Sequence, residues 1–258
     1  MGRLLDKTRK GLRTVGSFIG TGSPIAAECM AVAGLDYFIF DMEHSPYGLD
    51  EAVACIRASE SSGISPLVRI PEITRENILK ALDAGADGIV IPAVRTLEEA
   101  ERIVEYGKYY PQGNRGYCPT RANGFGFSDA MSEGILPYAA RCNKETMLIP
   151  QCETLECLSD IDRISALDGI DGIFIGPFDL SLAMGIPGEF TKREFTDAIE
   201  HIRRTVQGNG KPVFIFCPDT ESAILRAEQG YDSLTVSLDT GMLINSYKRL
   251  LSDLEGKL

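Results

Sequence analysis

Charged and polar side chains follow four short apolar runs in this chain of 258 residues. Burying such groups is costly unless they are paired or bind a ligand, so their position needs a chemical reason. Together the runs deliver several carboxylates, a histidine and an arginine, which are groups that acid–base chemistry next to a metal ion would use. The residues are Asp41, Glu43, His44, Arg69, Gln151, Glu153 and Asp179.

Glu153 and Asp179 are candidate ligands of a metal ion. Either carboxylate alone could instead cap the helix that follows it. At the ends of two adjacent predicted strands, they are better explained as a pair that binds one hard divalent cation. Carboxylate oxygens completed by water suit Mg²⁺ or Mn²⁺, and Co²⁺ is a further candidate.

His44 and Arg69 are candidates for proton transfer and anion binding. Of the two histidines in the chain, His201 lies in a polar helical stretch and is expected at the surface. His44 instead follows a predicted strand within an acidic cluster, which favours a functional role. Arg69 could form a structural ion pair with Asp41 or Glu43, or hold the carboxylate of a ligand with its planar guanidinium.

The positions of the lysines argue against a Schiff-base mechanism. Such a mechanism needs a desolvated lysine at the reacting centre. None of the nine lysines lies at the C-terminal end of a predicted strand. The metal-dependent interpretation is therefore preferred.

A repeated pattern indicates which elements position these side chains. A helical segment ends in Gly-x-Asp, and an apolar run follows, at residues 34–36, 85–87, 169–171 and 230–232. Glycine suits a helix C-terminus because it adopts positive φ without a Cβ penalty, and a short apolar run suits a strand buried on both faces. Filling the gaps predicts eight strands, near residues 14–18, 37–41, 66–70, 88–92, 147–153, 172–176, 212–216 and 233–237.

Alternating strands and helices of this number predict an α/β fold, a single (β/α)₈ TIM barrel over residues 1–258. No G-x-G-x-x-G follows the first strand, which weakens a dinucleotide-binding alternative. Catalytic groups of such barrels lie where the strands end, and the polar residues above fall at those positions. Residues 108–128 are rich in Gly, Pro, Arg and aromatics and lack periodicity, so they are expected to be functional or disordered.

Composition narrows the partners and the compartment. The formal charge is −11, and a net negative chain repels phosphate backbones, so nucleic acid is not expected as a partner. No apolar run reaches the roughly 18 residues of a membrane span, and the N-terminus lacks the apolar segment of a secretory signal. Seven cysteines without a C-x-x-C pair suit free thiols, so a cytoplasmic location is expected.

Six ordered motifs carry a resemblance to a known family. They are FIFDMEHSPYGLD, PLVRIPE, KALDAGADGIVIPAV, GNRGYCPTRANGFG, IPQCE and GIFIGPFDLSLAMG. Together they resemble the HpcH/HpaI aldolases, which are class II, metal-dependent pyruvate aldolases. Two features depart from that family: Phe18-Ile19 stands where many relatives have a tryptophan, and Cys152 stands where the metal motif often has isoleucine. The first departure affects the expected aldehyde-side pocket.

The resemblance implies a role for each site residue. Glu153 and Asp179 would bind the metal, His44 would be the base, and Arg69 would stabilise the enolate. The 2-oxo acid would be contacted by Arg69, Asp179, Gln151 and the backbone at Phe178.

The resemblance also implies a homo-oligomer. Asp83 would support the histidine of a neighbouring subunit, with a solvated helix end as its alternative interpretation. The family implies a hexamer with exchanged C-terminal helices, which residues 241–258 could supply.

The reaction implied is the reversible cleavage of a 4-hydroxy-2-oxo acid to pyruvate, or a related 2-oxo acid, and an aldehyde. One alternative is an acyl-CoA lyase like the citrate lyase β barrels, although only Arg115 and Arg121 offer basic groups for such a cofactor. The other alternative is a barrel that binds a 2-oxo acid without catalysis.

Overall fold

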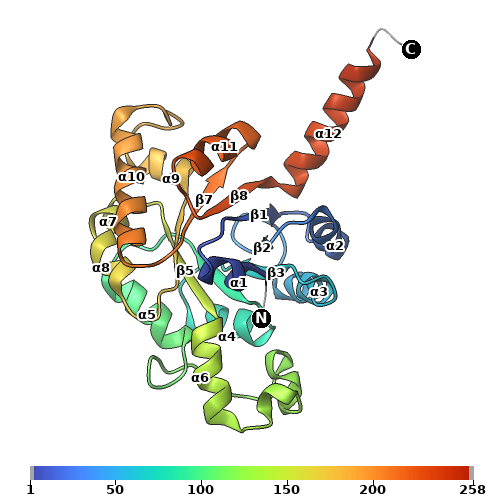
Figure 1. Ribbon diagram of the computed structural model, residues 1–258, viewed down its shortest axis with the longest axis vertical. Helices are drawn as coiled ribbons and strands as arrows, with labels where there is room; N and C mark the ends of the chain where they lie inside the picture. The colour runs from blue at the N-terminus through green and yellow to red at the C-terminus, as the bar shows by residue number, and fades with distance from the viewer. Residues whose placement is uncertain (1–2, 256–258) are drawn as a thin grey trace.

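A closed barrel of eight parallel strands, paired in the order of the sequence, forms the centre of the molecule (Figure 1). The computed structural model describes residues 3–255. The predicted (β/α)₈ barrel is confirmed, and no strand end differs from its predicted position by more than one residue. The strands are β1 (Thr14–Ile19), β2 (Tyr37–Asp41), β3 (Ser65–Arg69), β4 (Gly88–Ile91), β5 (Met147–Cys152), β6 (Ile173–Ile175), β7 (Val213–Cys217) and β8 (Ser233–Leu238).

Helices surround the barrel and connect successive strands. Within residues 3–255, no helix is long and apolar enough to cross a membrane. The α-helices are α1 (Arg3–Arg9), α2 (Pro24–Ala33), α3 (Leu49–Ser59), α4 (Arg75–Asp83), α5 (Leu97–Gly107), α6 (Ile135–Glu145), α7 (Leu155–Ser159), α8 (Ile161–Ala166), α9 (Pro177–Ala183), α10 (Arg193–Gly208), α11 (Thr220–Glu228) and α12 (Asp239–Leu254). Two 3₁₀ helices, η1 (Arg121–Gly126) and η2 (Asp129–Met131), lie between α5 and α6.

The repeated Gly-x-Asp pattern precedes β2, β4, β6 and β8. Its four glycines have φ values of 93°, 98°, 94° and 88°, the left-handed conformation that ends a helix without a Cβ clash. Three of its aspartates then accept a backbone N–H at the start of the preceding strand. The donor is the second residue of β1 and of β5, and the first residue of β7. The pairs are Asp36 with Val15, Asp171 with Leu148, and Asp232 with Val213. The motif therefore both ends a helix and fixes the start of the strand beside it.

Residues along each strand alternate between the inside of the barrel and the layer under the helices. The inner apolar cluster contains Phe18, Tyr37, Ile39, Leu67, Val90, Met147, Ile149, Phe174, Phe214 and Leu4 of α1. A separate cluster holds the intervening strand residues, such as Phe38 and Phe40, with the helix residues that cover them. Because side chains alternate along a strand, the inward phase reaches Asp41, Arg69 and Gln151 at the strand ends.

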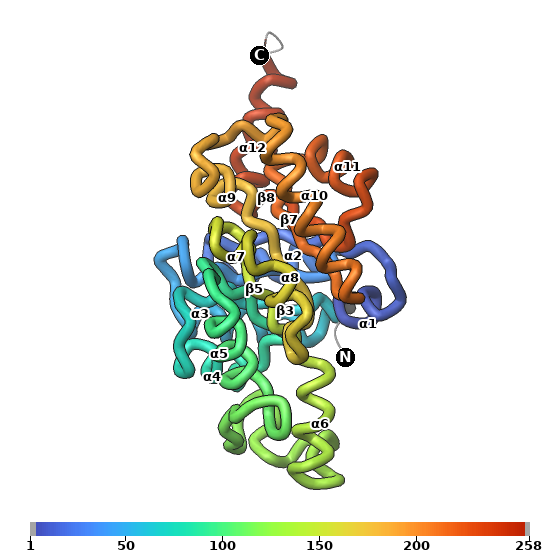
Figure 2. The backbone as a smooth tube through the Cα atoms, turned by 90° about the vertical axis from the view of Figure 1, so that its left-hand side faces the viewer, coloured from blue at the N-terminus to red at the C-terminus, as the bar shows by residue number. Residues whose placement is uncertain are grey.

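Two segments project from the barrel at opposite ends of the molecule (Figures 1 and 2). One is α12, and the other comprises η1, η2 and α6. The second segment includes the end of the stretch 108–128 that was predicted to be functional or disordered. Tyr109 and Tyr117 from that stretch pack at steep angles against Tyr138 of α6. The centroid distances are 6.3 Å for Tyr109 and Tyr138 and 6.2 Å for Tyr117 and Tyr138.

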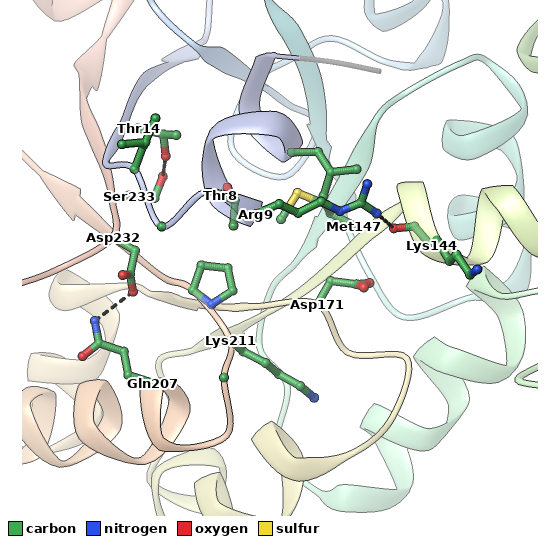
Figure 3. A pocket seen from close by; sticks show the side chains of 15 residues that line it. Thr8, Arg9, Thr14, Lys144, Met147, Asp171, Gln207, Lys211, Asp232 and Ser233 are labelled. Atoms are coloured by element: carbon green, nitrogen blue, oxygen red, sulfur yellow. Dashed lines mark hydrogen bonds between the residues drawn. The ribbon is translucent and has the colours of Figure 1, made fainter.

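A cavity of about 500 Å³ lies at the N-terminal ends of the strands (Figure 3). Thr14, Met147 and Ser233, the first residues of β1, β5 and β8, contribute to its wall. Lys144 and Lys211 also line it. Because barrel enzymes carry their chemistry at the opposite, C-terminal ends of the strands, this cavity is not the candidate active site.

Candidate active site

A second cavity, of about 430 Å³, opens at the C-terminal ends of the strands. The strand ends bring six of the predicted site residues to its wall. Glu153 lies directly beside them, because its carboxylate contacts the side-chain amide of Gln151. The six lining residues are Asp41, His44, Arg69, Gln151, Phe178 and Asp179.

Asp41 and Arg69 form a buried, bidentate ion pair. The register of β2 and β3 places the two residues opposite each other. Arg69 donates from Nε to Asp41 Oδ1 at 2.9 Å and from Nη2 to Oδ2 at 2.7 Å. Burial alone would raise the pKa of Asp41, but the hydrogen bonds and charge of Arg69 outweigh it and hold that pKa below 3.8. Of the two ion-pair partners considered for Arg69, Asp41 is therefore the one that it hydrogen-bonds. The Arg69 guanidinium also lies over the Phe18 ring, 4.6 Å from its centroid.

Glu43 and His44 leave β2 in a turn that Asp41 stabilises. Asp41 Oδ1 accepts the backbone N–H groups of Glu43 at 3.0 Å and His44 at 3.3 Å. The imidazole of His44 is 64% exposed, and its Nε2 lies 3.7 Å from Glu43 Oε2. The same carboxylate oxygen lies 3.3 Å from Arg69 Nη1. Glu43 therefore stands between the candidate base and the candidate anion-binding group.

Glu153 is a buried carboxylate, with only 6% of the residue exposed. Its Oε1 accepts the backbone N–H of Ala93 at 2.7 Å, and its Oε2 accepts a hydrogen bond from Gln151 Nε2. Burial, helped by the charge of Asp179, raises the pKa of Glu153 to about 7. The cap of the following helix α7 is Thr154, whose hydroxyl accepts the Cys157 N–H at 3.1 Å. Glu153 therefore has no helix-capping role.

Gly176 permits the close approach of β5 and β6 at this point. A Cβ on Gly176 would lie 2.5 Å from Glu153 Oε2 and 2.8 Å from Gln151 Nε2, so any other residue would displace these two side-chain ends. The chain then enters α9 through Pro177, which places Asp179 in the first turn of that helix. This turn sets Asp179 at the cavity wall beside Glu153.

The remaining wall of the cavity is largely aromatic and apolar. Phe178 packs edge-to-face on Phe190 at 5.1 Å and lies 5.9 Å from Phe216. Phe18, at one of the two places where the sequence departs from the family it resembles, lies 5.9 Å from Phe216 and lines the same cavity. Phe216 was not among the residues predicted for the site, and Glu43 was predicted there without a role of its own. The two-residue alternation of β7 marks Phe216 as inward-facing. Glu43 follows an apolar run, and the structure places it beside Arg69, for which it was one of the two ion-pair partners considered.

Asp83 lies apart from this cavity. It is the last residue of α4, and its Oδ1 accepts a hydrogen bond from Arg115 Nη2 at 2.8 Å. Arg115 is itself buried and stacks on Tyr109 with a ring distance of 4.8 Å. Within one chain, Asp83 is therefore part of an ion pair and does not reach His44.

Comparison with known proteins agrees with this geometry. Residues 14–246 match the family described as HpcH/HpaI aldolase/citrate lyase. The chain belongs to that family. It is therefore an aldolase, an enzyme that makes or breaks carbon–carbon bonds. Its Gln151-Cys152-Glu153 and Gly176-Pro177-Phe178-Asp179 segments stand at the ends of β5 and β6.

Relatives of this aldolase cover nearly the whole chain. A 5-keto-4-deoxy-D-glucarate aldolase of Escherichia coli O139:H28 (strain E24377A / ETEC) is 32% identical over 237 residues, which are 92% of this chain and 90% of that protein. An HpcH/HpaI aldolase from Desulfitobacterium hafniense DCB-2 superposes with a TM-score of 0.91 at 29% identity, covering 99% of this chain and 98% of the other. The citrate synthase SbnG superposes with a TM-score of 0.87 at 29% identity, with the same coverage.

Proposed function

We propose that this aldolase reversibly cleaves a 4-hydroxy-2-oxo acid into pyruvate, or a related 2-oxo acid, and an aldehyde, with a divalent cation held by Glu153 and Asp179. The observation that carries the proposal is an excess of negative charge. Four carboxylates, those of Asp41, Glu43, Glu153 and Asp179, gather at one cavity. Among its lining residues in the described part of the chain, Arg69 is the one permanent cation, and Asp41 already neutralises it.

The side chains near Glu153 fit a hard cation. The donors are oxygens, which Mg²⁺ and Mn²⁺ prefer, and Co²⁺ accepts the same set. Gln151 Oε1 is buried and has no hydrogen-bond partner among residues 3–255, so a cation or its bound water would satisfy it. No group of three His, Cys, Asp or Glu side chains in that range could hold a metal ion by itself. Two carboxylates would therefore leave the other positions to water and substrate.

A divalent cation held by Glu153 and Asp179 would supply a Lewis acid for the negative charge that develops on the 2-oxo group. Arg69 adds a fixed positive charge for the substrate carboxylate or for the enolate that forms on cleavage. Its Nη1 is the nitrogen that Asp41 leaves available, because Nε and Nη2 already donate to Asp41. Asp41 also keeps the guanidinium plane fixed, which limits the reorganisation needed in the transition state.

His44 would move the proton. Its exposed imidazole lines the cavity and would accept the proton of the C4 hydroxyl. As that proton leaves, the C4 oxygen becomes the aldehyde carbonyl and the C3–C4 bond breaks. The bonding electrons pass to C3 and the 2-oxo group as an enolate. A proton delivered to C3 from protonated His44, directly or through water, then gives pyruvate and restores the base, and the reverse sequence forms the bond.

The aldehyde would lie against the apolar wall formed by Phe178, Phe216 and Leu238. Such a wall favours aldehydes with an apolar portion. The relatives named for 5-keto-4-deoxy-D-glucarate make that dicarboxylate the first substrate to test. A panel that compares carboxylated with uncharged aldehydes in the condensation direction would decide between these expectations.

The acyl-CoA alternative finds little support at this site. A nucleotide cofactor would need cations for its phosphates. The two arginines considered for it are already engaged: Arg115 pairs with Asp83 at 2.8 Å, and Arg121 pairs with Glu60 at 2.5 Å.

Assembly is a second part of the proposal. Helix α12 extends from the barrel (Figure 1). Several of its apolar residues are exposed, among them Leu250 and Leu251, and the exposed fraction of Leu251 is 68%. An apolar groove of about 590 Å³ runs between α2 and α12 and is lined by Ile25, Met30 and Leu243 among others. We propose that α12 of one subunit covers apolar surface of another in a closed, symmetric oligomer, with the hexamer of the family as the expected state. Asp83 would meet the His44 of a neighbouring subunit in that assembly.

The proposed chemistry is tested by a turnover assay of the purified protein. A 4-hydroxy-2-oxo acid is supplied after EDTA treatment, with and without added Mg²⁺, Mn²⁺ or Co²⁺, and pyruvate release is measured. We expect no turnover in the stripped enzyme and recovery with metal. Full turnover without metal would contradict the proposal and would reopen a Schiff-base route.

A further inference from the structure

Ala93 adopts a backbone conformation that residues other than glycine rarely take. It lies just after β4 and has a φ of 52°, in the left-handed region where the Cβ is crowded by the backbone. Among residues 3–255, the other non-glycine residues with positive φ are Phe125 and Ser237, and Ser237 lines the candidate active-site cavity. Strained backbone persists only where the surrounding structure fixes it, and it gathers at functional sites. The contacts around Ala93 show what fixes it.

Two hydrogen bonds join the turn after β4 to the turn after β5. The backbone N–H of Ala93 donates to Glu153 Oε1 at 2.7 Å. The hydroxyl of Thr154 donates to the backbone carbonyl of Val94 at 2.8 Å. Val94 is itself fully buried in the layer between the strands and the helices. Two successive residues after β4 are therefore bonded to two successive residues after β5.

The positive φ of Ala93 permits these contacts to exist together. Rotation about the N–Cα bond changes the direction of the N–H relative to the chain that follows it. With Val94 held in the core, a negative φ would therefore turn the Ala93 N–H away from Glu153. Ala93 is an exposed residue, so burial of its own methyl group does not impose the conformation.

The consequence is a carboxylate that is held at both of its oxygens. Ala93 donates to Oε1 of Glu153, and Gln151 Nε2 donates to Oε2. A carboxylate oxygen has two lone pairs, so one hydrogen bond to each leaves capacity for a cation. Groups that hydrogen-bond a metal-binding carboxylate orient it, and their loss typically weakens metal binding by about 10–100-fold.

We infer that Ala93 is a positioning residue for the cation: its left-handed backbone directs an N–H to Glu153 Oε1 and holds that carboxylate in the orientation that binds the metal. The inference rests on the proposed function, because it needs Glu153 to be a metal ligand. The strain at Ala93 is then the cost of orienting the carboxylate before the metal arrives. A turn that only connected β4 to α5 would leave metal affinity independent of the residue at position 93.

The test compares Ala93→Asn with Ala93→Val, which add side chains of similar size with opposite preferences for positive φ. Asparagine accepts the left-handed conformation, whereas valine, branched at Cβ, does not. The Kd for Mn²⁺ is measured by calorimetric titration of each purified protein at one pH. We expect Ala93→Asn to bind Mn²⁺ as the wild type does. We expect the Kd of Ala93→Val to rise by about tenfold or more, because the N–H no longer points at Glu153.

Phe125→Val is the matched control. Phe125 has a φ of 56° and is exposed, but it lies in η1, on a segment that projects from the barrel. The substitution places the same backbone strain outside the site, so it should leave the Kd for Mn²⁺ unchanged. Urea unfolding of the metal-free proteins shows that each variant is folded. If Ala93→Val does not fold, Ala93→Leu takes its place, because leucine is not branched at Cβ and strains the turn less.

Equal Mn²⁺ affinity in Ala93→Asn and Ala93→Val, whether unchanged or weakened alike, overturns the inference, because backbone conformation would then have no effect of its own. A rise in Kd for Phe125→Val that matches the rise for Ala93→Val also overturns it, since strain anywhere would suffice. A wild-type protein that binds no Mn²⁺ would instead overturn the proposed function, so the two failures are distinguishable.

Discussion

Arg69 and Asp41 face each other across two neighbouring strands, and the guanidinium donates two hydrogen bonds, of 2.9 and 2.7 Å, to the carboxylate. The pair fixes the guanidinium at the cavity wall and leaves Nη1 without a bond to Asp41. A charge held in this way needs little rearrangement when an enolate forms. The pair thus connects the register of the barrel to the chemistry at its mouth.

Arg69→Lys should remove most of the activity although the charge is kept. A lysine is a point charge that cannot donate in parallel to Asp41 and also reach a ligand. Loss of one transition-state donor typically costs about 10²–10³ in rate, so we expect kcat/KM to fall by about that factor. The measurement is steady-state pyruvate release, with circular dichroism to confirm folding. Near-wild-type turnover would show that Arg69 has only a structural role.

Glu153→Gln should weaken metal binding while the barrel remains folded. The substitution keeps the size and shape of the side chain that contacts Ala93 and Gln151. It removes one of the two negative charges proposed to bind the metal. We expect the Kd for Mn²⁺ to rise by about 100-fold or more in calorimetric titration, since even changes around a ligand cost about 10–100-fold. Glu156→Gln is the matched control, because Glu156 is an exposed carboxylate nearby that pairs with Arg95. Equal metal affinity in the two variants would remove Glu153 from the site.

The metal-free protein should become less stable as the pH rises toward neutrality. The pKa of Glu153 is raised to about 7 by burial, above the 4.5 of an exposed glutamate. Between these values the folded state binds a proton that the unfolded state has released, so the free energy of unfolding falls with rising pH. The full effect amounts to about 3 kcal/mol and is present below pH 4.5.

Urea unfolding at several pH values between 4.5 and 8 measures this slope. Glu153→Gln lacks the titrating group, and saturating Mg²⁺ keeps the carboxylate ionised, so both should flatten the profile. A wild-type slope that matches Glu153→Gln in the absence of metal would be incompatible with a raised pKa for this group.

Acidic substitutions on α12 should disrupt the assembly. Leu250→Asp combined with Leu251→Asp places charges on apolar side chains that are exposed in a single chain. We expect a shift to smaller species in light scattering and a loss of activity, because Asp83 would no longer meet a neighbouring His44. Lys248→Asp, an exposed polar position on the same helix, is the control. A wild-type protein that is monomeric and fully active would end this proposal.

The sequence by itself determined the barrel and the rim on which the site lies. The Gly-x-Asp repeat and the short apolar runs specify where helices end and parallel strands begin, because backbone conformation and burial act locally. Alternation along β5 then places Gln151 and Glu153 on the same face. These local rules account for the agreement of all eight strands and for the residues expected at the cavity.

Only the tertiary structure decided how those residues pair. The bond of Arg69 to Asp41 depends on the register of two strands, which no local pattern fixes. The position of Glu43 between Arg69 and His44 depends on how the chain turns after β2, and the capture of Asp83 by Arg115 joins α4 to a segment over 30 residues away. Such contacts are between residues distant in sequence, so they are set by packing and charge in the folded molecule and not by the preferences of any one segment.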